Sequence, residues 1–428
     1  MDSNTAWMLI ASCLVFLMIP GLAFFYGGLV RAKNVLNMIM LSLGSMIVTG
    51  LVWVLWGWSI AFGGGNGAGI VGNPFTGFLL RNIVIAKDGQ FVSLEAKNAL
   101  YPACVNVIFQ CAIAMLAVAI ISGAIAERVK FSTWIIFVGF WITFVYAPLA
   151  HMDWNTNGLL APDGMLSQAI GIPACDNAGG ALLGVGSAIS ALMVVMIIGR
   201  RRGFQITPMK PHNLTLTMLG IFLLLIGSFG LTGGSALRVN AAPSYAILVT
   251  ILCVSASSFA WLLVEHFKYG HFTALGAASG MVAGLIAILP GVTTLSPLWA
   301  LITGLLAGGI ACFAVSLKYR LGYDDSLDVI ATNGVGGIVG LFAVGLFSQG
   351  NGLLCGGGIR LLLIELLVII FVIVFAGVIT GLIAFALEKT IGWRVSENEE
   401  LLGIDVMDHG ERAYDFEDAM NSVIKGAK

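Results

Sequence analysis

The chain has 428 residues, of which 58% are hydrophobic and only 10% are charged. Soluble domains carry about a quarter charged residues, so this composition excludes a soluble fold of this size and indicates a membrane protein. The formal net charge of −1 also removes any electrostatic basis for nucleic-acid binding.

Eleven long apolar runs follow one another along the chain. A run of about twenty apolar residues is long enough, as a helix, to cross the hydrocarbon core of a bilayer. The sequence therefore predicts an all-α membrane protein with eleven transmembrane helices. The runs are Ala6–Leu29, Val35–Phe62, Ala99–Ala126, Phe131–Pro148, Ala178–Gly199, Leu214–Leu231, Tyr245–Val264, Phe272–Leu289, Leu298–Leu317, Val329–Phe347 and Leu361–Leu387.

The loops between these runs alternate between basic and nearly base-free. One set contains eleven lysines and arginines, whereas the alternate set contains five, three of them in one long loop. Basic loops of multi-pass proteins stay in the cytoplasm, and long loops count for less in this rule. We therefore expect a multi-pass protein of the cell membrane with its N-terminus outside and its C-terminus in the cytoplasm.

The fifth and tenth runs begin alike. Asp176 precedes one and Asp325 precedes the other, and each carboxylate is followed by glycine-rich apolar sequence. Because these two runs start from opposite sides, they indicate two inverted five-helix repeats with a path at their interface, plus a C-terminal eleventh helix. Each aspartate could cap its helix or shape a substrate site, and both roles stay open. Glu365, near the start of the last run, is expected to be an interfacial charge.

We expect two parts: residues 1–388 as the transmembrane transporter domain and residues 389–428 as a cytoplasmic regulatory tail. The tail is polar and could be a solvated extension or a docking element. The chain shows no phosphate-binding glycine loop, no HExxH and no nucleophile elbow, so an enzyme is not expected. The seven cysteines form no ligand cluster, so neither a metal nor a cofactor is expected.

Seven ordered motifs together resemble the ammonium transporter (Amt/Mep/Rh) family, and they cover essentially the whole chain. The resemblance implies eleven transmembrane helices, a homotrimer, and a separate hydrophobic pore in each subunit. It also implies that ammonium is recruited at an outer vestibule and loses its proton before an inner pore lined by two facing histidines. The motifs are Pro20–Gly28 followed by Arg31 and Asn34, Ala124–Arg128, Ala150–Trp154, Asp176–Gly180, Lys210–Asn213, Asp324–Asp325 leading to Gly334, and Gly403–Tyr414.

The resemblance carries a set of substrate-binding residues over to this chain. Trp154 matches the vestibule tryptophan, whose ring face attracts cations. Ser235 matches the vestibule serine, a neutral hydrogen-bond partner. Asp176 matches a buried aspartate that orders the vestibule. Phe109 and Ala178 complete the expected vestibule.

The expected pore departs from the family pattern. Ile113 and Leu231 stand where the family has two stacked phenylalanines, and Ser228 stands in place of a tryptophan. Gly184 and Asn333 stand where it has the twin histidines. Neither glycine nor asparagine can carry a proton near neutral pH, so a relay through paired imidazoles is not expected here. The expected pore lining is Phe25, Tyr26, Ile113, Leu231, Ser228, Gly184 and Asn333.

Three hypotheses for function follow. The first is transport of ammonium or ammonia through an atypical pore, because the recruitment residues are kept. The second is a channel for a different small solute such as a larger amine, because several pore residues are smaller than those of the family. The third is a non-conducting ammonium sensor that acts through its tail.

The tail keeps the family's cytoplasmic signature, which implies a role in nitrogen regulation. In the family this segment packs against the cytoplasmic face of the trimer and can receive the PII regulatory protein. The expected partners are therefore a small amine substrate, two further copies of the chain, PII and membrane lipid. The expected docking residues are Gly403, Asp405, His409, Gly410, Glu411 and Tyr414.

Overall fold

The computed structural model describes the chain except residues 1, 65–68, 82, 88–89, 94–99 and 415–428. Within this part, eleven helical segments are long and apolar enough to cross a membrane. The predicted all-helical class and the predicted number of spans are therefore confirmed. The spans are Ser3–Leu29, Ala32–Phe62, Ala103–Ile125, Phe131–Trp154, Gly180–Ile198, Leu214–Gly234, Ala241–Tyr269, Ala274–Gly291, Pro297–Leu321, Ile330–Phe347 and Arg360–Thr390.

Several spans join an α-helix to a short π-helical or 3-10 segment, and a two-stranded antiparallel hairpin lies outside the spans. The α-helices are α1 (Asp2–Leu29), α2 (Val35–Val52), α3 (Trp58–Phe62), α4 (Ala103–Ile125), α5 (Phe131–Trp141), α6 (Ala147–Trp154), α7 (Met165–Ile170), α8 (Ser187–Ile198), α9 (Leu214–Gly234), α10 (Ala241–Tyr269), α11 (Ala274–Ile288), α12 (Pro297–Ala314), α13 (Leu317–Leu321), α14 (Val335–Phe347), α15 (Arg360–Thr390), α16 (Glu397–Leu402) and α17 (Ile404–His409). The π-helical segments are η2 (Trp53–Gly57), η4 (Ile142–Tyr146), η5 (Gly180–Gly186) and η7 (Ile330–Gly334), and the hairpin is β1 (Val84–Lys87) with β2 (Gln90–Ser93).

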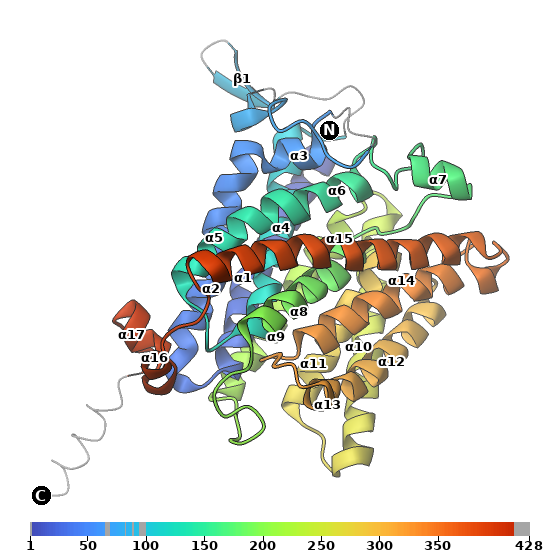
Figure 1. The fold of residues 1–428 in the computed structure, drawn as a ribbon. Coiled ribbons are helices and arrows are strands. Elements are labelled where there is room, and N and C mark those ends of the chain that lie inside the picture. Colours follow the sequence, from blue (N-terminus) through green and yellow to red (C-terminus); the bar gives the residue numbers. More distant parts are fainter. Residues whose placement is uncertain (1, 65–68, 82, 88–89, 94–99, 415–428) are drawn as a thin grey trace, which may run out of the picture.

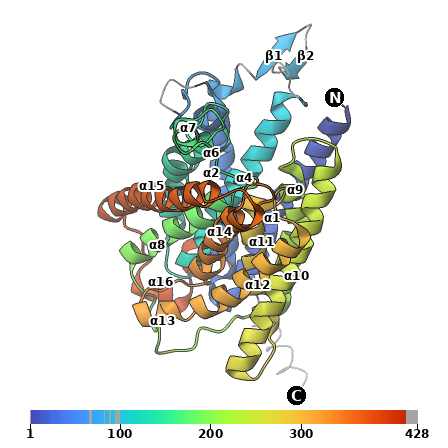
Figure 2. The ribbon, with the colours of Figure 1, turned by 90° about the vertical axis from the view of Figure 1, so that its right-hand side faces the viewer.

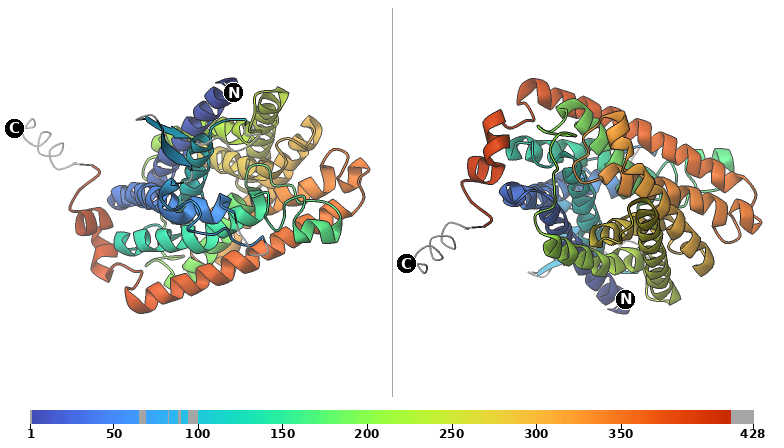
Figure 3. Two further views of the ribbon diagram at one scale, coloured as in Figure 1. Left: turned by 90° about the horizontal axis from the view of Figure 1, so that it is seen from above. Right: turned by 90° about the horizontal axis from the view of Figure 1, so that it is seen from below.

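The two ends of the bundle are different. The hairpin, α3, α6 and α7 gather at one end, which we call the hairpin end (Figures 1 and 2). The short helices α13, α16 and α17 lie at the opposite end, which we call the tail end. The eleventh span, α15, runs along one side of the bundle against α8, α14 and α5 (Figure 3).

The fourth span is longer than its apolar run predicts. The run was expected to end at Pro148, but the helix continues through α6 to Trp154. Proline cannot donate a backbone hydrogen bond and normally disturbs a helix interior. Here the π-helical turn η4 comes directly before α6, so Pro148 falls in the first turn of a new segment. This extension places Trp154 at the hairpin end.

The starts of the fifth and tenth spans meet inside the bundle. Both begin with a π-helical segment, η5 and η7, and these two segments contact each other. Because an odd-numbered and an even-numbered span begin on opposite faces, the two starts approach from opposite ends. The meeting of η5 and η7 lies at the interface between the two five-helix halves, as the inverted-repeat plan requires.

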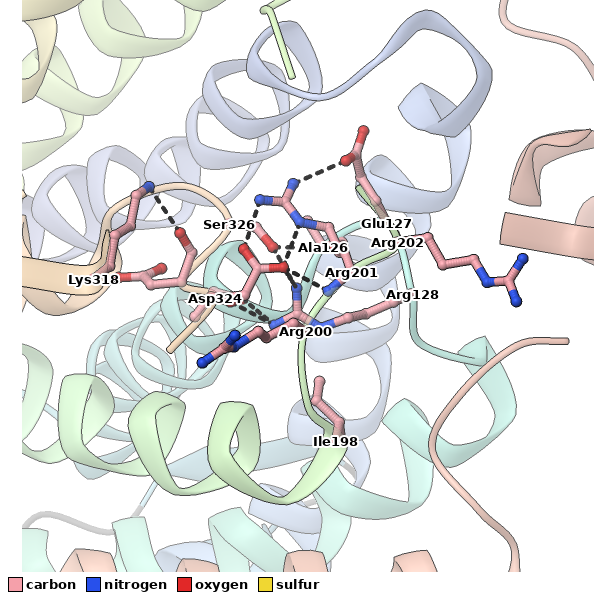
Figure 4. Close-up of polar contacts among 12 residues, drawn as sticks. Ala126, Glu127, Arg128, Ile198, Arg200, Arg201, Arg202, Lys318, Asp324 and Ser326 are labelled. Carbon is pink, nitrogen blue, oxygen red and sulfur yellow. Dashed lines mark hydrogen bonds and ion pairs between the residues drawn. The ribbon is translucent and has the colours of Figure 1, made fainter. Parts of the chain in front are cut away.

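A buried network of ion pairs ties the loops together at the tail end (Figure 4). The guanidinium of Arg201 lies 2.9 Å from Glu127 Oε2 and 2.8 Å from Asp324 Oδ1. Arg128 lies 3.1 Å from Asp324, and Arg31 lies 2.9 Å from Glu127. These five residues come from four separate loops. Burial alone would raise the pKa of Glu127, but Arg201 and Arg31 outweigh it and hold that pKa at about 2.

We predict that Glu127→Gln lowers the free energy of unfolding at pH 7 by about 3 kcal/mol, because it leaves buried guanidinium groups without their counter-charge. The pKa of Glu127 is lower in the folded chain than its ordinary value of 4.5. Its stabilisation is therefore complete above that ordinary value and is lost as the pH falls toward 2. Thermal unfolding in detergent should thus show a difference between wild type and variant that shrinks below about pH 4.5.

The matched control is Glu397→Gln, which removes a carboxylate that pairs with Arg202 at the exposed surface. Exposed ion pairs contribute little, so this variant should unfold like the wild type. An equal effect of the two substitutions would contradict the structural role of the buried network.

Candidate functional site

A cavity of about 200 Å³ lies at the hairpin end, and we call it the vestibule. The first turns of α4, the end of α6, the loop before η5 and the end of α9 form its walls. Four of the five predicted substrate-binding residues line it, namely Trp154, Ser235, Phe109 and Ala178. The full lining is Phe62, Asn106, Phe109, Gln110, Ile113, Trp154, Asn177, Ala178, Ser235 and Leu237.

The fifth predicted residue, Asp176, does not line the cavity. Its carboxylate accepts hydrogen bonds from the backbone N–H groups of Gly179, Gly180 and Ala181, at 3.0, 2.6 and 2.7 Å. Its carbonyl oxygen accepts a bond of 2.9 Å from Nε1 of Trp154. Asp176 therefore caps the helix start and fixes the indole ring, and it shapes the vestibule through these neighbours.

Glu365 supports the same loop from the eleventh span. Its Oε1 accepts a 2.8 Å hydrogen bond from the backbone N–H of Cys175, next to Asp176. Glu365 is 0% exposed, and the neighbouring residues Leu361 and Ile364 of α15 belong to an apolar cluster with α14 and the loop before η5. The expectation that Glu365 is an interfacial charge is therefore wrong. Sequence position near a helix start suggested the interface, whereas the tertiary fold covers that helix end with the loop of residues 170–175.

A second cavity of about 250 Å³ opens toward the tail end. Four predicted pore residues line it: Phe25, Tyr26, Leu231 and Asn333. Aliphatic side chains from α1, α4, α9 and α11 form most of the remaining wall, with Leu183 from η5. The wall is thus apolar along most of its length, with amide and hydroxyl groups supplied by Asn333, Thr332 and Tyr26.

The vestibule and the tail-end cavity are two distinct cavities. Among the described residues, none lines both of them. Ile113 faces the vestibule and Leu231 faces the tail-end cavity, and both side chains are buried. The two residues at the expected gate positions therefore belong to different cavities.

Two predicted pore residues, Ser228 and Gly184, line neither cavity. The hydroxyl of Ser228 donates to the carbonyl oxygen of Leu225 at 2.6 Å, so it is used within its own helix. A Cβ atom built on Gly184 would lie 2.8 Å from Cα of Gly337. The fifth and tenth spans therefore approach backbone to backbone at this point, which only a residue without a side chain permits.

The five histidines also lie outside both linings. His151 is buried in α6, where Nδ1 lies 3.0 Å from the carbonyl oxygen of Ala61. His212 and His409 lie at the tail end, where they contact the tail or belong to it. The remaining pair, His266 and His271, flanks the end of α10. The described cavities therefore contain no imidazole.

The tail-end mouth contains a charged pair that the sequence did not single out. The ammonium group of Lys318 lies 2.5 Å from Asp328 Oδ1 and donates to the carbonyl oxygen of Asp325 at 3.0 Å. Lys318 and Asp328 both line the cavity. The backbone of Asp328 has a φ of +61°, which costs free energy for a residue with a side chain. In the sequence, this pair was marked only by a cluster of aspartates that follows the basic loop containing Lys318.

The tail is folded onto its own subunit. The carboxylate of Asp405 accepts bonds from the backbone N–H groups of Leu36 and Asn37, at 3.0 and 2.8 Å, and so caps α2. His409 Nε2 lies 3.1 Å from Asn37 Nδ2. Tyr414 places its hydroxyl 2.9 Å from a ring nitrogen of His212. Three of the six expected docking residues, Asp405, His409 and Tyr414, therefore contact this chain itself, and nothing in the sequence marked Asn37 as their partner.

Comparison with known proteins gives a consistent result. The model of the Ammonium Transporter Family matches residues 6–414. The chain is 42% identical over 440 residues to an ammonium transporter of Mycobacterium tuberculosis, covering 98% of this chain and 92% of the relative. It is 37% identical over 417 residues to ammonium transporter Amt1 of Archaeoglobus fulgidus, covering 96% and 99%.

Solved structures agree with these sequences. Saccharomyces cerevisiae Mep2 superimposes with a TM-score of 0.81 at 26% identity, over 93% of this chain and 91% of Mep2. A structure described as a sensor Amt protein gives a TM-score of 0.82 at 27% identity, over 95% and 98%.

We predict that Gly184→Ala lowers the free energy of unfolding by about 1–3 kcal/mol, because the new methyl group would overlap Gly337 and Ile286. The control is Gly139→Ala in α5, where a Cβ would meet only Val48 at an ordinary 3.7 Å. Thermal unfolding in detergent should show a loss at position 184 and none at 139. Tolerance of both substitutions would mean that η5 and α14 are farther apart than the structure places them.

Proposed function

The chain belongs to the ammonium transporter family, and on that premise we propose that it moves ammonium or ammonia across a cell membrane through the two cavities. The observation that carries this proposal is the vestibule, in which the indole ring of Trp154 and the hydroxyl oxygen of Ser235 line one space. An aromatic face attracts a cation, and a hydroxyl oxygen accepts an N–H bond. Ammonium satisfies both conditions because it is a cation and carries N–H donors.

We further propose that the pore is atypical. Gly184 and Asn333 occupy the positions at which the family pattern has two histidines, and Ile113 with Leu231 replaces the aromatic gate. Asparagine can hydrogen-bond to ammonia or ammonium but cannot take up a proton near neutral pH. A histidine relay is therefore absent from this proposed route, and Leu183 lines the same cavity as Asn333.

Orientation and assembly belong to the same proposal. The basic residues Arg128 and Arg201 lie at the tail end (Figure 4), and Arg31 joins the same network through Glu127. Basic loops remain in the cytoplasm, so the tail end is placed inside and the N-terminus outside. Residues 389–428 then form the cytoplasmic regulatory part. We propose a homotrimer in lipid, in which each subunit keeps its own passage.

A second candidate function is a non-conducting ammonium sensor that acts through its tail. Two observations favour it over a channel for a larger amine. No described residue lines both the vestibule and the tail-end cavity. The tail is docked through Asp405 onto the helix that follows α1, so a change at the bundle could reach a partner.

We predict that the wild-type protein in liposomes gives an ammonium-driven current or internal alkalinisation. Asn333→His should make this flux fall as the pH drops below about 6.5, because a protonated imidazole in the tail-end cavity repels a cation. Asn333→Gln, which keeps an amide and cannot titrate, is the control and should show no such step. Ammonium binding without flux in the wild type would replace transport by the sensor, and flux of bulkier amines alone would favour the larger-amine channel.

The tail gives a separate prediction about PII. Deleting residues 394–428 should abolish retention of PII on the purified protein, and Asp405→Ala should weaken it by releasing the tail from α2. Glu397→Gln, at an exposed position, should leave retention unchanged. A pull-down of PII by each variant measures this. Full retention by the truncated chain would end the proposal that the tail is the docking element.

A further inference from the structure

A second, wider cavity adjoins the vestibule at the hairpin end. It has a volume of about 400 Å³, and we call it the entrance groove. Trp58, Phe62 and Tyr101 contribute aromatic rings to its wall. The entrance groove and the vestibule have four lining residues in common, so the two cavities adjoin. These are Phe62, Asn106, Trp154 and Leu237.

Asn106 lies at this junction, and its amide oxygen has no hydrogen-bond partner among the described residues. Its Nδ2 donates to the hydroxyl of Tyr101 at 3.2 Å, which orients the amide. Its Oδ1 is a buried atom without a hydrogen-bond partner among the described residues. A buried acceptor left without a donor costs free energy, so such an atom in a native structure is a candidate partner for water or a ligand.

A second amide oxygen in the same condition lies one helical turn further along α4. Oε1 of Gln110 is also buried and unpartnered within the described part of the chain. Residues four apart lie on the same face of a helix, and both Asn106 and Gln110 line the vestibule. The wall formed by α4 therefore presents two acceptors in succession along the inward path.

On the opposite wall, the donors of Ser235 and Trp154 are already used, and the amide of Asn177 also lines the vestibule. The hydroxyl of Ser235 donates to the carbonyl oxygen of Leu231 at 2.7 Å, so its lone pairs remain available. The indole N–H of Trp154 is used by Asp176. The chemistry at these positions is thus oxygen acceptors with aromatic faces, which suits a small cation that carries several N–H donors.

We propose that Asn106 is a substrate ligand: its Oδ1 accepts an N–H from ammonium as the ion moves from the entrance groove into the vestibule, before Gln110 and Ser235 take over. This inference rests on the proposed function and assigns a selectivity role within it. The amide oxygen can bind only an ion that carries an N–H donor. Ammonium has four, methylammonium has three, and tetramethylammonium has none, so Asn106 favours the least substituted ion.

The test is Asn106→Ala in the full-length protein in liposomes, with Asn106→Leu as a second variant that keeps the side-chain size. A hydrogen bond to a charged group is lost, so the KM for ammonium should rise about tenfold while the maximal rate stays within about twofold. Inhibition by tetramethylammonium, which can bind only through the aromatic rings, should be unchanged. Tyr101→Phe frees the amide without removing it and should raise the KM by a smaller factor.

The matched control is Asn351→Ala, an exposed asparagine of the loop before α15. It should leave every parameter at the wild-type value, and thermal unfolding should show that all variants fold. An unchanged KM in both Asn106 variants, or an equal loss for ammonium and tetramethylammonium, would overturn the role of Asn106 while the transport function stands. A wild-type protein that neither binds nor moves ammonium would overturn both.

Discussion

Every peptide group that enters the hydrocarbon layer needs a hydrogen-bond partner, because no water is available there. The two spans that begin within the fold, at Gly180 and Ile330, meet this requirement through carboxylates. Asp176 accepts from three N–H groups at the first start. Asp325 accepts from the N–H of Ile330 at 2.7 Å at the second. Both cavities are built on these helix starts, so the passage depends on the two caps.

The surroundings of the two caps give the passage different ends. Beside Asp176 lie the indole of Trp154 and, through Cys175, the buried carboxylate of Glu365. Beside Asp325 lies the ammonium group of Lys318, which is balanced by Asp328. Oxygen acceptors and aromatic faces thus meet a cation at one end, and a paired positive charge stands at the other. Inverted symmetry of the helices does not extend to the chemistry of the two mouths.

A continuous set of polar contacts links the tail to the tenth span. The backbone N–H of Ile404 donates to Asn34 Oδ1, and Asn34 Nδ2 donates to Glu127. Glu127 binds Arg201, which in turn binds Asp324, the neighbour of the Asp325 cap. Each member is buried, so a displacement of α17 changes the partners of the next member. These contacts connect the proposed regulatory tail with the start of the tenth span.

The sequence by itself determined the membrane class, the eleven spans and the special character of Asp176 and Asp325. These follow from the local chemistry of apolar runs, loop charges and carboxylates at helix starts. The resemblance of the ordered motifs to the ammonium transporter family also predicted that Trp154, Ser235, Phe109 and Ala178 line one vestibule. It placed Gly184 in the pore lining by counting from Asp176.

Only the tertiary structure decided which of these groups face a cavity. Gly184 packs on the backbone of Gly337, and Glu365 is covered by the loop before η5. The amide oxygen of Asn106, which has no hydrogen-bond partner among the described residues, could be recognised only from the tertiary structure, where residues of α4, α6 and α9 line one cavity. The spacing of residues along the chain determines which of them share a helix face. What that face contacts depends on the neighbouring helices. Their approach depends on packing between residues that are far apart in the sequence.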